Sequence, residues 1–255
     1  MLERMFDLTD RIALVTGGNG GIGLGMARAI GQAGATVIIV GRNAEKSAAA
    51  LRELQSLGVR AESVLCDVAK EVDVQRLFAG VQSRHGRLHI LVNNAGSTVR
   101  KAPQDFSLDD WNQEMDVNLT SAFLCSRSAY PLMVAAGSGK VINIGSILST
   151  FGAPYAPAYC ASKGGIVQLT KSLAIAWAKD GIQANAVLPG WIDTDLTIAA
   201  RNQVPGLNER VLARTPAGRW GTAQDLGGIA VFLSSPASDF VTGAAIPVDG
   251  GYSAA

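Results

Sequence analysis

The sequence has few charged residues and almost no net charge. Asp, Glu, Lys and Arg make up 17% of its 255 residues, and the formal net charge is +1. It has no basic run that would favour nucleic acid or an anionic membrane. No apolar run reaches the length of about 18 residues typical of a membrane-spanning helix, and the N-terminus lacks the apolar core of a signal peptide. We therefore expect a cytoplasmic protein without a nucleic-acid or membrane partner.

Cysteine and histidine are also scarce. The three cysteines, Cys66, Cys125 and Cys160, are widely spaced and form no C-x-x-C pair, which is typical of free thiols in a reducing compartment. No group of His, Cys, Asp and Glu has the spacing of metal ligands. The sequence therefore predicts neither a disulfide framework nor a metal site.

Apolar residues are abundant, at 48% of the chain, and they occur in an alternating order of short runs and helical segments. This order predicts a single α/β domain over residues 1–255, with a doubly wound, parallel seven-stranded sheet and helices on both faces. We expect strands at 11–16, 36–40, 60–66, 88–92, 140–145, 183–188 and 244–248. We expect helices at 21–34, 44–57, 71–85, 107–136, 158–179 and 222–233.

One segment, at about 192–219, departs from this regular order. It is longer than usual crossover loops, has weak periodicity, and contains Pro205, Gly206 and Pro216. Long insertions of this kind are often lids over active sites, so we expect a substrate lid here.

A glycine-rich stretch, TGGNGGIG, follows the first expected strand. Glycines allow a tight turn there, and the free N–H groups of the next helix face an anion, so this position suits a dinucleotide phosphate loop. The spacing is not G-x-G-x-x-G, and an ordinary glycine-rich turn is the alternative. The candidate cofactor residues are Gly17, Asn19, Gly21, Ile22 and Gly23.

The end of the second expected strand bears on the choice of cofactor. Gly41 stands where an acid that binds the ribose 2′-hydroxyl of NAD is expected, and Arg42 follows it. A guanidinium can hold a 2′-phosphate, so Arg42 favours NADP(H) over NAD(H). A solvated Arg42 is the alternative, and Gly20 lacks a basic side chain that would add a second phosphate contact.

Two further strand ends supply candidate cofactor residues. Asp67 could accept a hydrogen bond from the adenine amino group, and Val68 could supply a backbone N–H. The stretch NNAG would let backbone run against the adenosine ribose, although it is also a plausible turn. Its candidate residues are Asn94, Ala95 and Gly96.

Tyr159 and Lys163 form the pattern Y-x-x-x-K in an expected helix. Residues four apart lie on one face of a helix, so the pattern places a cation near a phenol. A free phenol has a pKa of about 10, and a nearby ammonium can lower it toward neutrality, as can an oxidised nicotinamide. Ser146, at the end of the preceding strand, could bridge a substrate oxygen and the phenol. Asn118, in mid-helix, could hold a water that links Lys163 to solvent.

Taken together, these motifs resemble the short-chain dehydrogenase/reductase family over nearly the whole chain, in the family's order. The matching pieces are TGGNGGIG, CDV, NNAG, Asn118, Ser146, Tyr159 with Lys163, Pro189-Gly190 and the C-terminal VDGG.

The resemblance implies a Rossmann-type fold with the cofactor phosphates at Gly17, Gly21 and Gly23. It implies that Tyr159 is the general acid/base, that Ser146 polarises the carbonyl, and that Lys163 holds the nicotinamide ribose. It further implies Asn118 in a proton relay and a homotetramer formed by the helices at 107–136 and 158–179. The nicotinamide carboxamide would bind at Pro189, Gly190, Ile192 and Thr194.

The substrate is open at this point. Arg100, after NNAG, is similar to a basic residue of the sugar-acid dehydrogenases, which act on gluconate or 2-deoxygluconate, and an NAD(H)-dependent enzyme of that type is one alternative. The 3-oxoacyl carrier-protein reductases are nearly as similar. An apolar and aromatic lining by Phe151, Pro154, Tyr155 and Trp191 would suit a bulky ketone. A non-catalytic NADP-binding regulator is an alternative of another class, although such a protein would not need its catalytic set.

Overall fold

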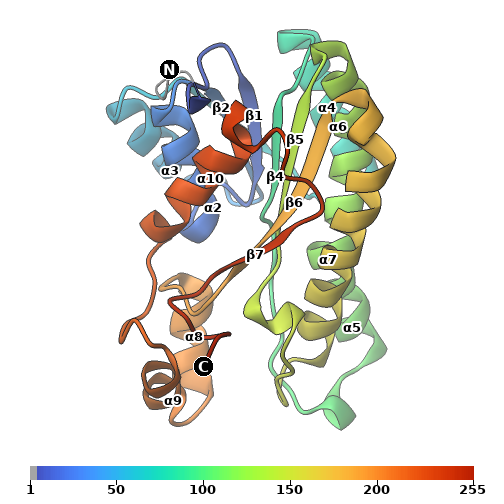
Figure 1. Cartoon of the computed structure of the whole chain (residues 1–255). Coiled ribbons are helices and arrows are strands. Elements are labelled where there is room, and N and C mark those ends of the chain that lie inside the picture. The colour runs from blue at the N-terminus through green and yellow to red at the C-terminus, as the bar shows by residue number, and fades with distance from the viewer. Residues whose placement is uncertain (1–4) are drawn as a thin grey trace.

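Seven short strands form one parallel sheet through the middle of the molecule (Figure 1). The structure is a computed structural model, and it describes residues 5–255. The strands lie in the order β3-β2-β1-β4-β5-β6-β7, with every neighbouring pair parallel. The predicted sheet is confirmed, and every predicted strand end is within two residues of the observed one. The strands are β1 (Ile12–Thr16), β2 (Thr36–Gly41), β3 (Ala61–Leu65), β4 (Ile90–Asn93), β5 (Gly139–Ile144), β6 (Ile182–Pro189) and β7 (Ala245–Val248).

Helices cover both faces of this sheet (Figure 1). Parallel strands need crossover connections, and helices in those connections pack against the sheet. One face carries α2 (Gly21–Gln32), α3 (Ala44–Ser56) and α10 (Gly227–Ser234), and the other carries α4 (Glu71–His85), α6 (Ser121–Ala136) and α7 (Pro157–Trp177).

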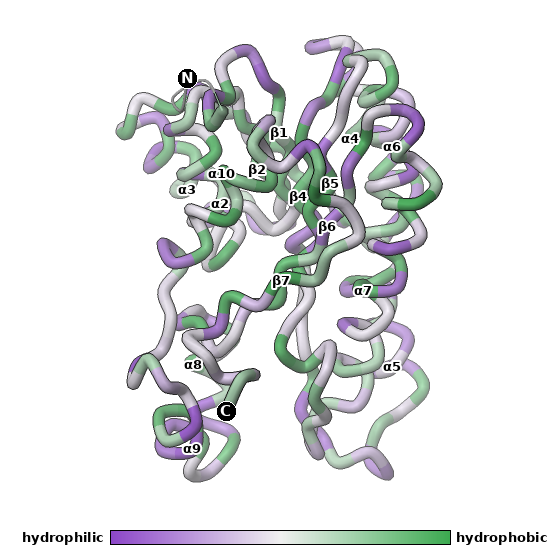
Figure 2. Tube along the Cα trace, in the orientation of Figure 1, coloured by the Kyte–Doolittle hydropathy of each residue, from purple (hydrophilic) through white to green (hydrophobic). Residues whose placement is uncertain are grey.

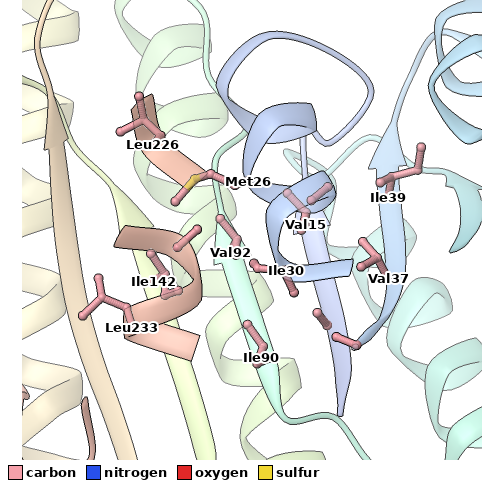
Figure 3. Packing of buried hydrophobic residues seen from close by; sticks show 14 of the residues in the cluster. Val15, Met26, Ile30, Val37, Ile39, Ile90, Val92, Ile142, Leu226 and Leu233 are labelled. Carbon is pink, nitrogen blue, oxygen red and sulfur yellow. The ribbon is translucent and has the colours of Figure 1, made fainter. Parts of the chain in front are cut away.

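The strands are apolar on both faces because both faces are buried. Figure 2 shows strands that are mostly hydrophobic between helices in which hydrophobic and hydrophilic residues alternate. Val15 and Ile39 pack with Met26 of α2 in the cluster of Figure 3. Their sequence neighbours Leu14 and Ile38 belong to the opposite cluster, beneath α4 and α6. Burial of each such side chain stabilises the fold by about 1.5–3 kcal/mol.

The order of the strands places a crevice between β1 and β4. The chain leaves β1 toward β2 on one side, and β4 leads to β5 on the other, so the strand order reverses between them. In open parallel sheets, ligands bind outside the carboxyl ends of the strands at such a switch point. The loops after β1 and β4 are therefore the expected walls of a site.

The long helix expected over 107–136 is interrupted. It consists of α5 (Leu108–Met115), a π-helical turn (Asp116–Thr120) and α6. Ser107 caps α5 as expected, because its hydroxyl accepts from Asp110 N–H at 3.0 Å. In the π-helical turn, Ser121 N–H donates to the Asp116 carbonyl five residues earlier. Such single π turns often lie at functional sites, and this one contains Asn118.

The segment at 192–219 is not a loop. It forms α8 (Asp195–Gln203) and α9 (Leu207–Arg214), which lie at the same end of the molecule as α5 (Figure 1). Ala200, Leu207 and Val211 make a small core there, packed against two tryptophans. The short helices explain the weak periodicity of the segment, since each contributes only one or two buried apolar residues. The helix expected at 222–233 likewise begins with a 3₁₀ turn (Ala223–Leu226) before α10.

The three cysteines are free thiols, and Cys66 and Cys125 are buried. Between residues 5 and 255, no three or more His, Cys, Asp and Glu side chains are grouped so as to hold a metal ion. Over the same range, none of the helices has both the length and the apolar character required to cross a membrane.

Candidate active site

A groove of about 300 Å³ opens at the carboxyl ends of the strands. It lies at the switch point between β1 and β4, and residues that follow β6 close its far side. Most of the predicted cofactor residues line it. They are Gly17, Asn19, Gly21 and Ile22 after β1, Asn94, Ala95 and Gly96 after β4, Tyr159 and Lys163 on α7, and Pro189, Gly190, Ile192 and Thr194 from the end of β6 onward.

Parts of the glycine-rich loop are packed so closely that they leave no room for a side chain. A Cβ atom at Gly23 would lie 2.3 Å from the Gly17 carbonyl oxygen and 2.4 Å from the Asn94 amide nitrogen. The Asn94 side chain donates to the Thr16 and Gly17 carbonyls at 3.0 and 3.1 Å, which ties the loops after β1 and β4 together. This backbone cradle at the start of α2 fits a pyrophosphate, because the first N–H groups of the helix have no partner within the helix.

The end of β2 contains no room for an acidic side chain beside the groove. A Cβ atom at Gly41 would lie 2.2 Å from the Asn19 amide nitrogen, which donates to the Ser47 hydroxyl at 3.0 Å. An acid at this position would therefore have to displace Asn19. Arg42 follows at the surface and is exposed.

Four predicted residues do not line the groove: Gly23, Arg42, Asp67 and Val68. Gly23 lies behind the loop, as its contacts show. Asp67 and Val68 follow β3 at the far side of the sheet from the catalytic candidates, where Asp67 accepts from Ala69 N–H at 3.3 Å. Arg42, Asp67 and Val68 thus share the strand ends beyond the groove, beside β2 and β3.

Lys163 is buried beneath the groove, with 3% of its surface exposed. Its Nζ lies 5.6 Å from the centre of the Tyr159 ring and donates to the Ile144 carbonyl at 2.7 Å. An ammonium carries three N–H donors, so one holds the side chain against β5 while others can point into the groove that Lys163 lines. The expected proximity of cation and phenol is present.

Ser146 is held at the start of a 3₁₀ turn (Ile147–Ser149). Its hydroxyl oxygen accepts from Leu148 N–H at 3.0 Å, which leaves the hydroxyl proton free to be donated. Its own N–H donates to the Ser149 hydroxyl, which donates in turn to the Lys163 carbonyl at 2.7 Å. Ser149 therefore fixes Ser146 relative to α7. This role could not be predicted from the sequence, because a serine in a loop carries no signal of its partner.

The Asn118 side chain is 2% exposed and is fully engaged with the protein. It accepts from Ser97 N–H at 2.8 Å and donates to the Ser97 carbonyl at 2.9 Å and the Ser162 hydroxyl at 3.2 Å. Both amide donors are used, so the side chain supports the loop after β4 against α7. That Asn118 holds a water linked to Lys163 stays a prediction, and its two amide N–H groups already have protein partners.

A smaller hollow of about 70 Å³ adjoins the groove. Of the four residues expected to give an apolar and aromatic lining, Tyr155 and Trp191 line it, whereas Phe151 and Pro154 do not. The lining also contains Thr98 and Arg100, and its other apolar members are Ile147, Leu148, Ala156 and Leu196. Phe151 turns instead toward the C-terminal segment. Its ring is 6.4 Å from that of Tyr252, and the Arg214 guanidinium lies over it at 4.9 Å.

Known proteins are similar to this chain over nearly its whole length. A family model described as "Enoyl-(Acyl carrier protein) reductase" matches residues 17–253. The chain is 42% identical over 255 residues to a 2-dehydro-3-deoxy-D-gluconate 5-dehydrogenase of Bacillus subtilis, and the match covers 98% of each. The chain belongs to the short-chain dehydrogenase/reductase family. It is therefore an oxidoreductase of that family, and the predicted family, fold and reaction class are confirmed.

Two further relatives agree with this placement. A 2-dehydro-3-deoxy-D-gluconate 5-dehydrogenase of Formosa agariphila is 40% identical over 248 residues, which cover 97% of this chain and 94% of that protein. A crystal structure of a gluconate 5-dehydrogenase from Burkholderia cenocepacia, in complex with NADP and tartrate, superposes with a TM-score of 0.94 at 40% identity. That match covers 100% of both chains.

Burial controls the protonation of the family's two signature side chains. Burial raises the pKa of Tyr159 to about 12, and a hydrogen bond with Ser146 lowers it only in part. Burial also lowers the pKa of Lys163 to about 8. That Lys163 lowers the phenol pKa stays a prediction. A protonated phenol at neutral pH is the form that can donate a proton to a substrate oxygen.

The groove also contains a residue pair that the sequence did not reveal. Lys46, near the start of α3, forms an ion pair at 2.7 Å with Asp195, at the start of α8. Both line the groove, at the side near Asn19. In the sequence, Lys46 could have been noticed only because it lies four residues after Arg42. Its partner Asp195 is 149 residues away, so the pair itself could not be predicted.

Proposed function

We propose that the chain is an NADP(H)-dependent ketoreductase or alcohol dehydrogenase, which transfers a hydride between nicotinamide and a carbonyl or secondary alcohol. One observation carries the proposal: Ser146 and Tyr159 line both the large groove and the smaller hollow beside it. A cofactor in the groove and a substrate in the hollow would therefore meet at these two hydroxyl groups.

The proposed catalytic residues are Asn118, Ser146, Tyr159 and Lys163. A bound nicotinamide cofactor supplies or accepts the hydride. In reduction, Ser146 donates a hydrogen bond to the carbonyl oxygen as that oxygen gains charge, and Tyr159 delivers the proton. Lys163, anchored on the Ile144 carbonyl, holds the ribose and orients the site. Asn118 keeps the loop after β4 in place through Ser97.

Arg42 is proposed to select NADP(H) through the 2′-phosphate. Arg42→Ala removes a charge-assisted contact, so the Kd for NADPH is expected to rise about 10- to 100-fold, while that for NADH stays within about twofold. Fluorescence titration of each cofactor measures both constants. Arg52→Ala makes the same charge change on the exposed side of α3 and serves as the control. Equal losses for NADPH and NADH in Arg42→Ala would show that Arg42 does not hold the phosphate.

The substrate is proposed to be a keto acid of the sugar-acid type. Arg100 lines the hollow beside Tyr159. It donates to the Leu196 carbonyl at 3.0 Å and to the Gln203 side chain at 3.1 Å. A guanidinium has five N–H donors, so these two bonds leave others for a carboxylate. The relatives named as gluconate-type dehydrogenases support this substrate class. A general carbonyl reductase is the second candidate, favoured by Tyr155 and Trp191 in the lining.

A panel of ketones tests the proposal. NADPH oxidation is measured with 5-ketogluconate, a 3-oxoester and an aryl ketone. We expect turnover mainly with the keto acid, and we expect Arg100→Ala to raise its KM about 10- to 100-fold through the lost charged hydrogen bond. Broad activity on the neutral ketones, unaffected by Arg100→Ala, would instead establish the general reductase. No turnover of any ketone with NADPH or NADH would reject both.

Three further properties belong to the proposal. Segment 192–219 acts as the substrate lid, since α8 contributes Leu196 to the hollow.

The chain forms a homotetramer through α6 and α7, whose exposed apolar side chains include Phe123, Val134 and Ile175. The protein is cytoplasmic, in keeping with its free thiols. Sedimentation of the purified protein at a mass other than four chains would reject the tetramer.

A further inference from the structure

Glu114 is a buried carboxylate with no part in the proposed reaction. It is the one buried residue of α5, and only 1% of its surface is exposed. A buried carboxylate is costly unless it is paired or hydrogen-bonded, so an apolar side chain would be the ordinary choice at this position. The contacts of Glu114 therefore bear on why a carboxylate occurs there.

Glu114 is the middle member of a row that holds the segment after β4. Residues spaced by four lie along one face of a helix, and the row consists of three polar side chains of α5 and the following π-helical turn. Each binds one of three alternate residues in the segment 97–101. The contacts are Asp110 Oδ2 with Lys101 Nζ at 2.6 Å, Glu114 Oε1 with Val99 N–H at 2.7 Å, and Asn118 Oδ1 with Ser97 N–H at 2.8 Å.

This row anchors the segment that contributes to the substrate hollow. The residues between the three bound ones make none of these contacts. Those residues are Thr98 and Arg100, and both line the hollow beside Tyr159.

The second carboxylate oxygen of Glu114 is unpaired. Oε2 is buried and has no hydrogen-bond partner within residues 5–255. Burial raises the pKa of Glu114, while hydrogen bonding by Val99 N–H and the Thr98 side chain lowers it. Thr98 immediately precedes Val99, whose N–H binds the other carboxylate oxygen, so the chain brings the Thr98 residue next to this carboxylate. The Thr98 hydroxyl otherwise makes only a long contact of 3.4 Å, to the Val99 carbonyl. A hydroxyl rotates to suit its partners, so it is free to donate to Oε2.

We propose that Glu114 is a positioning residue for substrate recognition, which accepts a hydrogen bond from the Thr98 hydroxyl. The hydroxyl proton then points toward Glu114, and the lone pairs of the Thr98 oxygen face the substrate. Thr98 then acts as an acceptor for a substrate hydroxyl group, while the adjacent Arg100 faces the carboxylate. The inference rests on the proposed function and deepens it. The substrate class becomes a polyhydroxylated keto acid, recognised by its hydroxyl groups as well as by its charge.

A matched pair of substrates and two variants test the inference. The substrates are 5-ketogluconate and 5-oxohexanoate, which share chain length, carboxylate and carbonyl position but differ in hydroxyl groups. Glu114→Gln keeps an acceptor for Val99 N–H but turns a donor toward Thr98, and Thr98→Val removes the hydroxyl. Each is expected to raise KM for 5-ketogluconate about tenfold, the effect of one lost hydrogen bond, with little change for 5-oxohexanoate.

The double variant separates this role from simple support of the loop. If Glu114 acts through Thr98, Glu114→Gln with Thr98→Val loses no more than either single variant, because the effects of coupled residues are not additive. Thr98→Ser, which keeps the hydroxyl, is expected to retain the wild-type KM. Additive losses, or an equal loss for both substrates in Glu114→Gln, would overturn the proposal.

Folding and the proposed function are checked separately. Thermal unfolding and NADPH titration show whether each variant is folded and binds the cofactor. If Glu114→Gln does not fold, Thr98→Val and Thr98→Ser still test the role of the Thr98 hydroxyl. Thr98→Val without a selective loss for 5-ketogluconate overturns the inference. A wild-type enzyme that does not distinguish the two keto acids also overturns it, although reduction of ketones remains established. A wild-type protein that reduces neither keto acid nor any other ketone rejects the proposed function itself.

Discussion

Replacement of Tyr159 with phenylalanine is expected to lower kcat for ketone reduction by about 10²- to 10⁴-fold, the range of a lost general acid. The phenol is the proton donor that lines both the groove and the substrate hollow. Phenylalanine preserves the ring and removes only the hydroxyl. The Kd for NADPH is therefore expected to stay within about twofold, because the hydroxyl adds little to ground-state binding. Stopped-flow reduction and cofactor fluorescence measure the two quantities.

Tyr155 provides a matched control for this experiment. Its phenol also lines the substrate hollow, and burial raises its pKa, yet it is not within the Y-x-x-x-K pattern. Tyr155→Phe is expected to change kcat by less than about tenfold, since it removes no proton donor from the reacting oxygen. Near wild-type turnover in Tyr159→Phe would reject the mechanism. If no variant or wild-type preparation turned over a ketone while all bound NADPH, a non-catalytic regulator would be the better account.

Replacement of Lys163 with methionine is expected to lower kcat about 10²- to 10³-fold and at the same time to stabilise the folded protein at pH 7. The ammonium is buried and donates to the Ile144 carbonyl, so its desolvation destabilises the fold. Methionine has a similar length and no charge. Chemical denaturation at pH 7 measures the gain in the free energy of unfolding, and steady-state kinetics measure the loss of turnover.

The pH dependence of stability checks the same residue. The pKa of Lys163 is about 8 in the folded chain, below the ordinary 10.5, because of burial. Between these values the unfolded chain binds the proton more strongly, so the free energy of unfolding rises with pH across this window. The wild type is expected to gain on the order of 3 kcal/mol from this group between about pH 8 and 10.5, and Lys163→Met to lack that gain. Parallel pH profiles for the two proteins would contradict the assignment.

Much of the fold could be predicted because its determinants are local. Strands such as Thr36–Gly41 are continuous apolar runs bounded by glycine or polar residues, and the glycine loop Gly17–Gly23 is contiguous in the sequence. The relation of Tyr159 to Lys163 also follows from one turn of helix. For these features, residues that are close in the sequence are also close in space, so the spacing alone predicts the structure.

The rest depended on contacts between distant segments. The π-helical turn at Asp116–Thr120 contains no glycine or proline that would predict an irregular helix. The hydrogen-bond partners of Asn118 lie 21 and 44 residues away in the sequence. From the sequence, Glu114 is expected at the surface of a polar helix. In the structure, the segment after β4 packs over it and donates a hydrogen bond to it from Val99 N–H. The raised pKa of Tyr159 likewise reflects burial by the whole fold, which no local pattern contains.

The contact between Gly41 and Asn19 restricts how the cofactor preference of this chain could evolve or be redesigned. Conversion toward NAD(H) calls for an acid at position 41, but its Cβ would stand 2.2 Å from the Asn19 amide nitrogen. Asn19→Ala first frees the space at the loss of one bond to Ser47, whereas Gly41→Asp first must displace the Asn19 side chain. The effects of the two substitutions are expected not to be additive, because both act on the same contact.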